Sequence, residues 1–338
     1  MTQLVNAETI DQTIQLASSM GFPNMDVVSS LQSISHLFGT TKKRCGIYLL
    51  AFQSKLFYIG QSMDVVRRFS QHRRIHADIV GFSFLPVTKL NLDNIEKSLI
   101  YKAESLGIKI TNAVHVTNVV GDTDFDLIVP ISEQNAWLST AFCTPINEAN
   151  HSKIILPQAQ QLRFSKHYSR FERHPLFQRA LNLTKQYLAT CVLAPRHTEY
   201  SFWSVSCMPS TNHSTWPRLL CLNAGVMELF VVGWERQSMD SMWSFITVAE
   251  DVLLEHWGSL KHFSEVFPFA HILRRGYRDA GQHQVTFQTC LGADMEILLA
   301  NPGVTKAAAA LVLRVMRKRA TIYGKFHCTQ LADSALSK

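Results

Sequence analysis

Residues 46–72 read GIYLLAFQSKLFYIGQSMDVVRRFSQH: two short apolar runs, each built round a tyrosine and a glycine, and then a run of positive charge. The two runs predict adjacent β-strands joined by a short loop. Strand parity decides where Tyr48 and Tyr58 point. An odd number of loop residues around Gln53–Lys55 puts both rings on one face of the hairpin, and an even number puts them on opposite faces. A site shared by the two tyrosines requires the odd loop; otherwise each tyrosine is simply a good strand residue.

A helix is expected directly after this hairpin. Ser62 can cap it, and Asp64 lies in its first turn, where a carboxylate complements the helix dipole. The apolar stripe of the helix consists of Val65, Val66 and Phe69. Arg68 and His72 lie four residues apart on one flank of that stripe, and we expect them to lie near the sheet.

A second helix is expected to open at Asp93, in the stretch LDNIEKSLIYKAESLG. Asp93 and Glu96 form an acidic variant of the capping box, so one interpretation is that Glu96 satisfies backbone donors at the helix start. A helical wheel adds another, because Glu96 lies inside the apolar arc, between Leu99 and Ile100. A carboxylate directed at the edge of a core has either a raised pKa or a nearby cation. Here the cation would be a divalent metal or Arg68.

Taken together, these residues resemble the GIY-YIG nuclease superfamily, which includes the incision nuclease of bacterial nucleotide-excision repair, many intron-encoded homing endonucleases and a few restriction enzymes. The match covers residues 45–112, about a fifth of the chain. Two spacings differ slightly from the family pattern, and both differences fall in expected loops. The matching features, in chain order, are Gly46-Ile47-Tyr48, Tyr58-Ile59-Gly60, Arg68, His72, Glu96 followed by Leu99-Ile100, and Asn112.

The resemblance implies a small catalytic domain with a central antiparallel sheet flanked by helices, which hydrolyses phosphodiester bonds in a nucleic acid. It assigns one Mg²⁺, for which Mn²⁺ can substitute, to Glu96 and water. It places Arg68 on a non-bridging phosphate oxygen, a task that suits a planar guanidinium better than an ammonium group.

The same resemblance gives roles to the remaining residues. Tyr48 or Tyr58 orients or deprotonates the attacking water, and which of the two is the base stays open. Because tyrosine has an ordinary pKa of about 10, base catalysis at neutral pH needs a cation such as Arg68 to lower it. His72 assists proton transfer or binds phosphate. The residues expected to brace the site are Gly46, Gly60 and Asn112.

Composition over all 338 residues is that of a globular chain, with a hydrophobic fraction of 46% and a charged fraction of 17%. A formal charge of +7 is compatible with a polyanionic partner such as DNA. No apolar run reaches the roughly 18 residues of a membrane span, and the N-terminus lacks a signal-peptide pattern, so we expect a cytoplasmic protein without a membrane partner. The seven cysteines form no CxxC pair and are expected to be reduced, buried thiols.

The predicted fold class is α+β. We expect an N-terminal helical segment over 1–40, a GIY-YIG nuclease domain over 41–120, a linker region over 121–165 and a C-terminal α+β domain over 166–338. The helical segment is expected to hold two short helices, and the second of them covers residues 25–38.

The C-terminal domain is expected to open with a helix over 175–194, followed by three strands between residues 200 and 234 and mostly helix from Met239 onward, interrupted by a strand over 284–290. Its tryptophans either stack on bases or fill a core. Because nuclease domains of this kind usually take specificity from an attached domain, we expect this one to recognise the target or a partner.

Two basic groups are expected to contact the phosphate backbone. Each has a plainer interpretation, either as solvated surface charge or as cations that complement a helix C-terminus. The residues are Arg67, Arg73 and Arg74 after the hairpin, and Arg317, Lys318 and Arg319 near the end of the last long helix.

The sequence thus predicts a Mg²⁺-dependent endonuclease acting on DNA, with double strands favoured, in restriction, phage defence or a mobile element. One alternative is a nucleic-acid-binding protein that keeps the scaffold without cutting. Another is a nuclease acting on RNA or single-stranded DNA. Two concerted cuts would need two active sites, and therefore a homodimer or two binding events.

Overall fold

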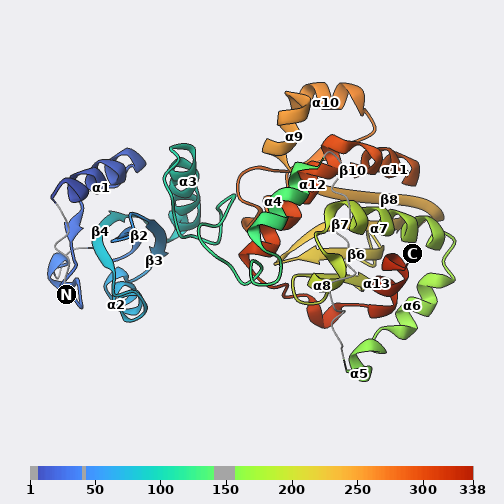
Figure 1. The fold of residues 1–338 in the computed structure, drawn as a ribbon, viewed down its shortest axis with the longest axis horizontal. Helices are drawn as coiled ribbons and strands as arrows, with labels where there is room; N and C mark the ends of the chain where they lie inside the picture. The colour runs from blue at the N-terminus through green and yellow to red at the C-terminus, as the bar shows by residue number, and fades with distance from the viewer. Residues whose placement is uncertain (1–6, 40–42, 141–156, 338) are drawn as a thin grey trace. The chain divides into compact units, whose positions relative to one another are not determined.

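The computed structural model describes residues 7–39, 43–140 and 157–337. The chain divides into two compact units, with the boundary between Val120 and Gly121. Each unit contains one antiparallel sheet, of four strands in the first and six in the second, together with helices (Figure 1). The predicted α+β class is confirmed at this level.

From Gly46 onward the N-terminal unit follows the expected order of strand, strand, helix, strand and helix. Its sheet has the strand order β1-β4-β2-β3, so β3 is an edge strand. The elements are α1 (Ala7–Met20), β1 (Asp26–Val27), η1 (Ser35–Leu37), β2 (Gly46–Phe52), β3 (Phe57–Ser62), α2 (Val65–Ile75), β4 (Ile79–Pro86), η2 (Lys89–Asn91) and α3 (Leu92–Ser105).

The prediction of a helix over residues 25–38 is wrong. Asp26 and Val27 instead form β1, which pairs with β4, and a short 3₁₀ turn follows at Ser35–Leu37. Val28 and Ile34 are buried in the core beneath α2. The apolar spacing of this segment therefore reflects residues that cover the sheet rather than one face of a helix.

Two separate apolar cores lie on the two faces of the four-stranded sheet. One contains Ile47 and Ile59 from the hairpin, together with residues of α1 and α3 such as Ile100. The other contains Tyr48 from the hairpin and Phe69 from α2. Accordingly α1 and α3 cover one face of the sheet and α2 covers the other (Figure 1).

The hairpin loop has the odd length that a shared tyrosine site requires. Tyr48 pairs with Gly60, and Leu50 pairs with Tyr58. Since Tyr48 and Leu50 are two residues apart on one strand, both tyrosines lie on the same face, in diagonal positions. Lys55 ends the loop in the left-handed region, with a φ of 62°, as expected for a three-residue hairpin connection.

The first turn of α2 is capped differently from the prediction. The N-cap is Asp64, whose Oδ1 accepts hydrogen bonds from the backbone N–H groups of Val66 at 3.1 Å and Arg67 at 3.3 Å. Ser62 lies one step earlier, where its hydroxyl accepts from the N–H of Asp64 at 3.1 Å. This double arrangement fixes the direction of α2 as the chain leaves β3.

The C-terminal unit is built on a six-stranded antiparallel sheet in the order β5-β6-β7-β8-β10-β9. Its strands are β5 (Trp203–Cys207), β6 (Arg218–Ala224), β7 (Met227–Glu235), β8 (Ser238–Ala249), β9 (His271–Leu273) and β10 (Gln284–Thr289). Its helical elements are α4 (Ile131–Ser139), α5 (Gln158–Gln161), α6 (Ser165–Glu172), α7 (Phe177–Cys191), α8 (Pro195–Thr198), α9 (Glu250–Trp257), α10 (Leu260–Val266), η4 (Arg278–Ala280), α11 (Gly292–Ala300), α12 (Pro302–Lys318), η5 (Gly324–Phe326) and α13 (Thr329–Leu336).

One face of this sheet packs against α7 and α12, in a large core that includes Leu188, Val312 and Ile246. The predicted helix near 175–194 and the strands between 203 and 235 are present. The region from Met239 onward is not mostly helical at its start, because β8 occupies Ser238–Ala249 at the centre of the sheet. Both faces of β8 are largely buried, so its sequence shows no alternation of apolar and polar residues.

The region over 121–165, expected to be a linker, packs in the C-terminal unit where the structure describes it. Phe125, Val129 and Trp137 are buried in the main core of that unit. Residues 141–156 of this expected linker lie outside the described residues. Among the described residues no single helix is long and apolar enough to cross a membrane; α11 and α12 meet that condition only together, across a bend of 85°.

The glycine opposite Tyr48 gives a direct test of the hairpin. A Cβ at position 60 would lie 2.6 Å from Cζ of the buried Tyr48 ring. Gly60→Ala should therefore displace this ring and lower the free energy of opening of the hairpin by about 1–3 kcal/mol, as overpacking does. Backbone amide exchange in β2 and β3 measures that free energy directly.

Gly39→Ala is the matched control, because a Cβ there would meet no atom within 4 Å. Its effect should stay within about 0.5 kcal/mol. Equal exchange rates in the two variants would contradict the close packing of Tyr48 on Gly60.

Candidate active site

The Tyr48 hydroxyl is the meeting point of three side chains on the α2 face of the sheet. It lies 2.8 Å from Nε2 of His72 and accepts a hydrogen bond from Nε of Arg68 at 3.3 Å. In the tautomer of His72 that carries its proton on Nδ1, the Tyr48 hydroxyl donates to Nε2. The spacing of four residues between Arg68 and His72 on α2 brings both side chains to one point on β2.

Tyr58 completes this group, and its exposure separates it from Tyr48. Its ring centroid lies 6.1 Å from that of Tyr48 and 5.0 Å from that of His72. Tyr48 is fully buried, whereas Tyr58 is half-buried and Arg68 is exposed. The surface of the group is thus formed by Tyr58 and Arg68, while Tyr48 holds the group together from within.

Burial, and then the proximity of Tyr58, raise the pKa of Tyr48 well above its usual value. Arg68 acts in the opposite direction through its hydrogen bond and charge, without offsetting burial. The hydrogen bond to Tyr48 in turn raises the pKa of Arg68, which keeps its charge. The lowered tyrosine pKa that base catalysis would need is therefore not found at Tyr48, which is a neutral phenol at neutral pH.

His72 is electrostatically distinct from an ordinary surface histidine. Burial, followed by the charges of Arg68 and His76, lowers its pKa to about 4. At neutral pH the ring is therefore uncharged, and it is a much weaker base than an ordinary histidine. Arg68 is also linked to Gln71 one turn away, whose Oε1 accepts from Nη1 of Arg68 at 3.0 Å.

The two signature glycines are required by close approach. An added Cβ at Gly46 would collide with the carbonyl oxygen of Leu85 and the ring of Phe84 on the neighbouring strand β4. An added Cβ at Gly60 would collide with the phenol of Tyr48. Both glycines thus serve the packing of the hairpin, which positions the tyrosines.

Asn112 braces the edge strand that carries Tyr58. Its Oδ1 accepts from the backbone N–H of Ile59 at 3.0 Å, and its Nδ2 donates to the Ile59 carbonyl at 2.7 Å. The buried amide thus pairs with β3 as another strand would. This contact fixes the position of β3 between the two signature residues Tyr58 and Gly60.

Glu96 lies on the α3 side of the edge strand rather than in the group around Tyr48. Its Oε2 accepts a hydrogen bond from Nε2 of Gln61 at 2.9 Å, and Oδ1 of Asp93 accepts from the same nitrogen at 2.5 Å. Gln61 directly follows Gly60, the cross-strand partner of Tyr48. Strand β3 therefore contributes to two polar groups, one on each face of the sheet: Tyr58 belongs to the group around Tyr48, and Gln61 to the group around Glu96.

Helix α3 begins at Leu92 with Asn91 as its N-cap, so Asp93 is not the capping residue that the sequence indicated. Asp93 and Glu96 lie on one side of the first turn instead, and two carboxylate oxygens come within 2.9 Å of one amide nitrogen. Mg²⁺ is commonly held by one or two carboxylates with water and substrate phosphate as further ligands. The oxygen donors of this pair fit such an ion.

A metal site made only of protein side chains is not found in the part of the chain that the structure describes. No group of three or more His, Cys, Asp or Glu side chains there is arranged to hold a metal ion. A divalent cation at Glu96 would therefore depend on oxygen ligands from water and substrate.

The basic residues predicted to contact phosphate differ in their surroundings. Arg67 and Arg74 are exposed on α2. Arg73 is only 7% exposed, and its guanidinium donates to the backbone carbonyls of Ala77, Ile79 and Val28 at 2.6–3.1 Å. Arg73 thus joins α2 to the sheet and is not presented to a phosphate.

The basic residues at the end of α12 also bind acidic and carbonyl groups of their own unit. Nε of Arg317 donates to Asp126 at 3.0 Å. Burial works to raise the pKa of Asp126, but hydrogen bonds led by that from Arg317 lower it to about 2. Lys318 donates to the carbonyl oxygen of Asp279, and Arg319 forms an ion pair with the Asp279 carboxylate at 3.3 Å. These side chains hold the end of α12 against neighbouring segments of the C-terminal unit.

Three residues of the site were missed by the sequence reasoning. Gln61 and Asp93 surround Glu96, and Gln71 holds Arg68. A signal existed for Gln61, which is a polar residue immediately after the second signature glycine.

Comparison with family models, with curated proteins and with solved structures finds no match for this chain.

The lowered pKa of His72 predicts a stability that depends on pH. The unfolded chain binds a proton at this residue near pH 6.5, whereas the folded chain does so only near pH 4. The contribution of His72 is therefore fully present above about pH 6.5 and is lost as the pH falls toward 4. His72→Gln keeps a hydrogen-bonding side chain but cannot titrate, so the stability of wild type relative to this variant should fall across that window.

Urea unfolding at a series of pH values, followed by circular dichroism, measures the difference. A wild-type advantage that stays constant from pH 7 to pH 4.5 would show that His72 keeps its ordinary titration in the folded protein.

Proposed function

We propose that this chain is a Mg²⁺-dependent endonuclease that hydrolyses phosphodiester bonds in DNA, with its active site on the β2-β3 hairpin. The observation that carries the proposal is the Tyr48 hydroxyl, placed between the Arg68 guanidinium and the neutral imidazole of His72. The literal signature residues and the carboxylate pair at Glu96 support the same chemistry. Proteins of the GIY-YIG type, which this region resembles, act in this way.

Arg68 is the residue that binds phosphate. It is exposed and charged, and Tyr48 and Gln71 hold its Nε and Nη1 atoms. A guanidinium fixed in this way can meet a non-bridging phosphate oxygen without losing further side-chain entropy. Charge that develops on the phosphate in the transition state would strengthen the contact.

Tyr58 is the phenol that faces the attacking water, because Tyr48 is fully buried. The bond from water oxygen to phosphorus forms as the bond to the leaving sugar oxygen breaks. The proton lost by the water passes by way of Tyr58 to solvent, because the lowered pKa of His72 makes its uncharged imidazole a weak proton acceptor. Tyr48 is a positioning residue, whose hydroxyl contacts both Arg68 and His72.

Glu96, with Asp93 beside it, would hold the divalent cation, and Gln61 would release its hydrogen bonds to the two carboxylates. When bound, the cation supplies positive charge to the phosphate and to the leaving oxygen. Asn112 and the two signature glycines keep the edge strand in register. The two polar groups of β3 lie on opposite faces of the sheet, so the proposal requires the nucleic-acid backbone to pass round the end of β3 at Gly60 and Gln61 to meet both.

A plasmid-nicking assay with Mg²⁺ tests the proposal. Arg68→Ala should lower the rate about a hundredfold to a thousandfold, the usual effect of removing a donor that stabilises transition-state charge. Glu96→Gln should lose metal-dependent cleavage, because an amide binds Mg²⁺ far less well than a carboxylate. Glu255→Gln, on an exposed position of the C-terminal unit, should cleave as wild type does.

Cleavage that survives in both site variants would contradict the assignment. DNA binding without cleavage by wild type, in Mg²⁺ and in Mn²⁺, would favour a binding protein on the same scaffold. A panel of labelled duplex, single-stranded DNA and RNA substrates identifies the preferred nucleic acid.

A further inference from the structure

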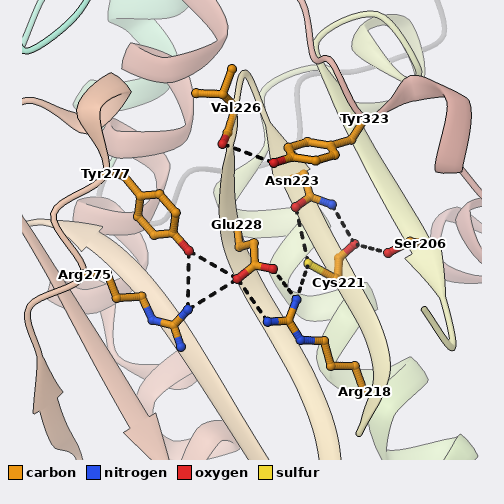
Figure 2. Close-up of polar contacts among 9 residues, drawn as sticks. All are labelled: Ser206, Arg218, Cys221, Asn223, Val226, Glu228, Arg275, Tyr277 and Tyr323. Carbon is orange, nitrogen blue, oxygen red and sulfur yellow. Dashed lines mark hydrogen bonds and ion pairs between the residues drawn. The ribbon is translucent and has the colours of Figure 1, made fainter. Parts of the chain in front are cut away.

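The C-terminal unit contains a second polar group, on the face of its sheet opposite α7 and α12. It is formed by strands β6 and β7 and by the segment after β9, and Glu228 lies at its centre (Figure 2). The Glu228 carboxylate accepts from Tyr277 at 3.2 Å, from Arg275 at 3.3 Å and from both terminal nitrogens of Arg218. Four donors occupy the acceptor sites of one carboxylate.

The polar group around Glu228 carries a net positive charge. Two guanidinium groups face one carboxylate, and burial followed by Glu228 raises the pKa of Tyr277 to about 12, so its phenol stays neutral. Arg275 also lies over the Phe245 ring, with its Cζ 3.7 Å from the centroid. Glu228 therefore serves to hold Arg218 and Arg275 in place rather than to contact a ligand itself.

Arg218 is a fixed cation beside a cavity. The residue is only 6% exposed, and Glu228 holds both of its terminal nitrogens. It lines a cavity of about 280 Å³, to which its guanidinium contributes positive charge.

The cavity is lined by polar and by aromatic side chains. Asn223 and the half-buried Ser206 belong to the polar lining, and Cys221 donates to Asn223 Oδ1 at 3.3 Å (Figure 2). Burial raises the pKa of Cys221, so this thiol is protonated at neutral pH. The aromatic lining consists of four flat rings, from Phe164, His167, Tyr323 and Phe326.

Phe326 is 45% exposed at the rim of this cavity, an unusual position for a phenylalanine in an otherwise well-packed unit. The volume is near the lower end of the range for small-molecule sites, about 300–1,000 Å³. Aromatic rings, a small volume and a few donors and acceptors in the lining suit one planar heterocycle with hydrogen-bonding edges. A long aliphatic chain or a peptide fits this lining less well.

We propose that this cavity binds a single unstacked nucleobase of the DNA on which the protein acts. The base stacks on the aromatic rings that line the cavity, and its edge faces the polar side chains of Arg218, Asn223 and Ser206. That the base belongs to a DNA strand rests on the proposed nuclease function, whereas the affinity of the cavity for a base does not. Target recognition by the C-terminal unit would then take place at one residue of the strand.

Ligand-observed NMR with the full chain tests this proposal. The chain carries Glu96→Gln to prevent cleavage, and the probes are the four deoxynucleosides, with deoxyribose as the control that lacks a base. At least one nucleoside should bind, and deoxyribose should not. Phe326→Ala should weaken that binding about tenfold, the usual contribution of one aromatic stacking partner. Leu291→Ala, at an exposed apolar residue that does not line the cavity, should leave it unchanged.

Short homopolymeric single strands then compete with the preferred nucleoside, to separate a base in DNA from a free nucleotide. Displacement by the strand of the same base supports the proposal. Absence of nucleoside binding, binding unaffected by Phe326→Ala, or failure of every strand to compete would overturn it. Plasmid cleavage by wild type is scored separately, so a failed nuclease assay alongside a positive nucleoside result would reject the catalytic proposal and keep the base site.

Discussion

The hydroxyl group of Tyr48 is the fixed point on which the proposed active site depends. It is buried, it cannot ionise near neutral pH, and it joins Arg68 and His72 at 3.3 Å and 2.8 Å. Two features of the chain put it there. The three-residue hairpin loop sets the register, and Gly60 leaves space for the ring. A different loop parity would turn one tyrosine to the other face of the sheet and separate it from α2.

A neutral phenol at the centre explains how the site combines a strong cation with an uncharged imidazole. In the proposed reaction Arg68 uses its charge to bind phosphate, and His72 is the hydrogen-bond partner of Tyr48. Burial and the nearby guanidinium both disfavour a second positive charge on the imidazole. The carboxylates at Glu96 and Asp93 are kept on the other side of β3, where they do not neutralise Arg68.

Much of the N-terminal unit could be predicted from the sequence, because its information is local. Strand alternation, helical spacing and two literal tripeptides placed Tyr48, Tyr58, Arg68 and His72 on neighbouring elements. The strand β1 was missed, since a two-residue strand has no period. Arg73 was misread for a related reason: the carbonyl groups that bind it come from Val28, Ala77 and Ile79, and their positions are set by tertiary structure.

The fold of the C-terminal unit was harder to predict from the sequence, for a physical reason. Its central strand β8 is buried on both faces, so the sequence shows no alternation, although its aromatic and β-branched residues favour a strand. The cavity beside Arg218 draws its residues from positions between 164 and 326, with no motif spacing. One signal was present, namely Asn223 and Glu228 within the otherwise apolar run LLCLNAGVMELF.

The most direct test of the central claim is a crystal structure of the full chain with duplex DNA and Ca²⁺, which can replace Mg²⁺ as a ligand of carboxylates while supporting little catalysis. This account predicts one backbone phosphate in hydrogen-bond contact with Arg68 and near Tyr58, and a cation between that phosphate and Glu96. DNA bound with no phosphate at Arg68, or a cation held away from Glu96, would contradict it.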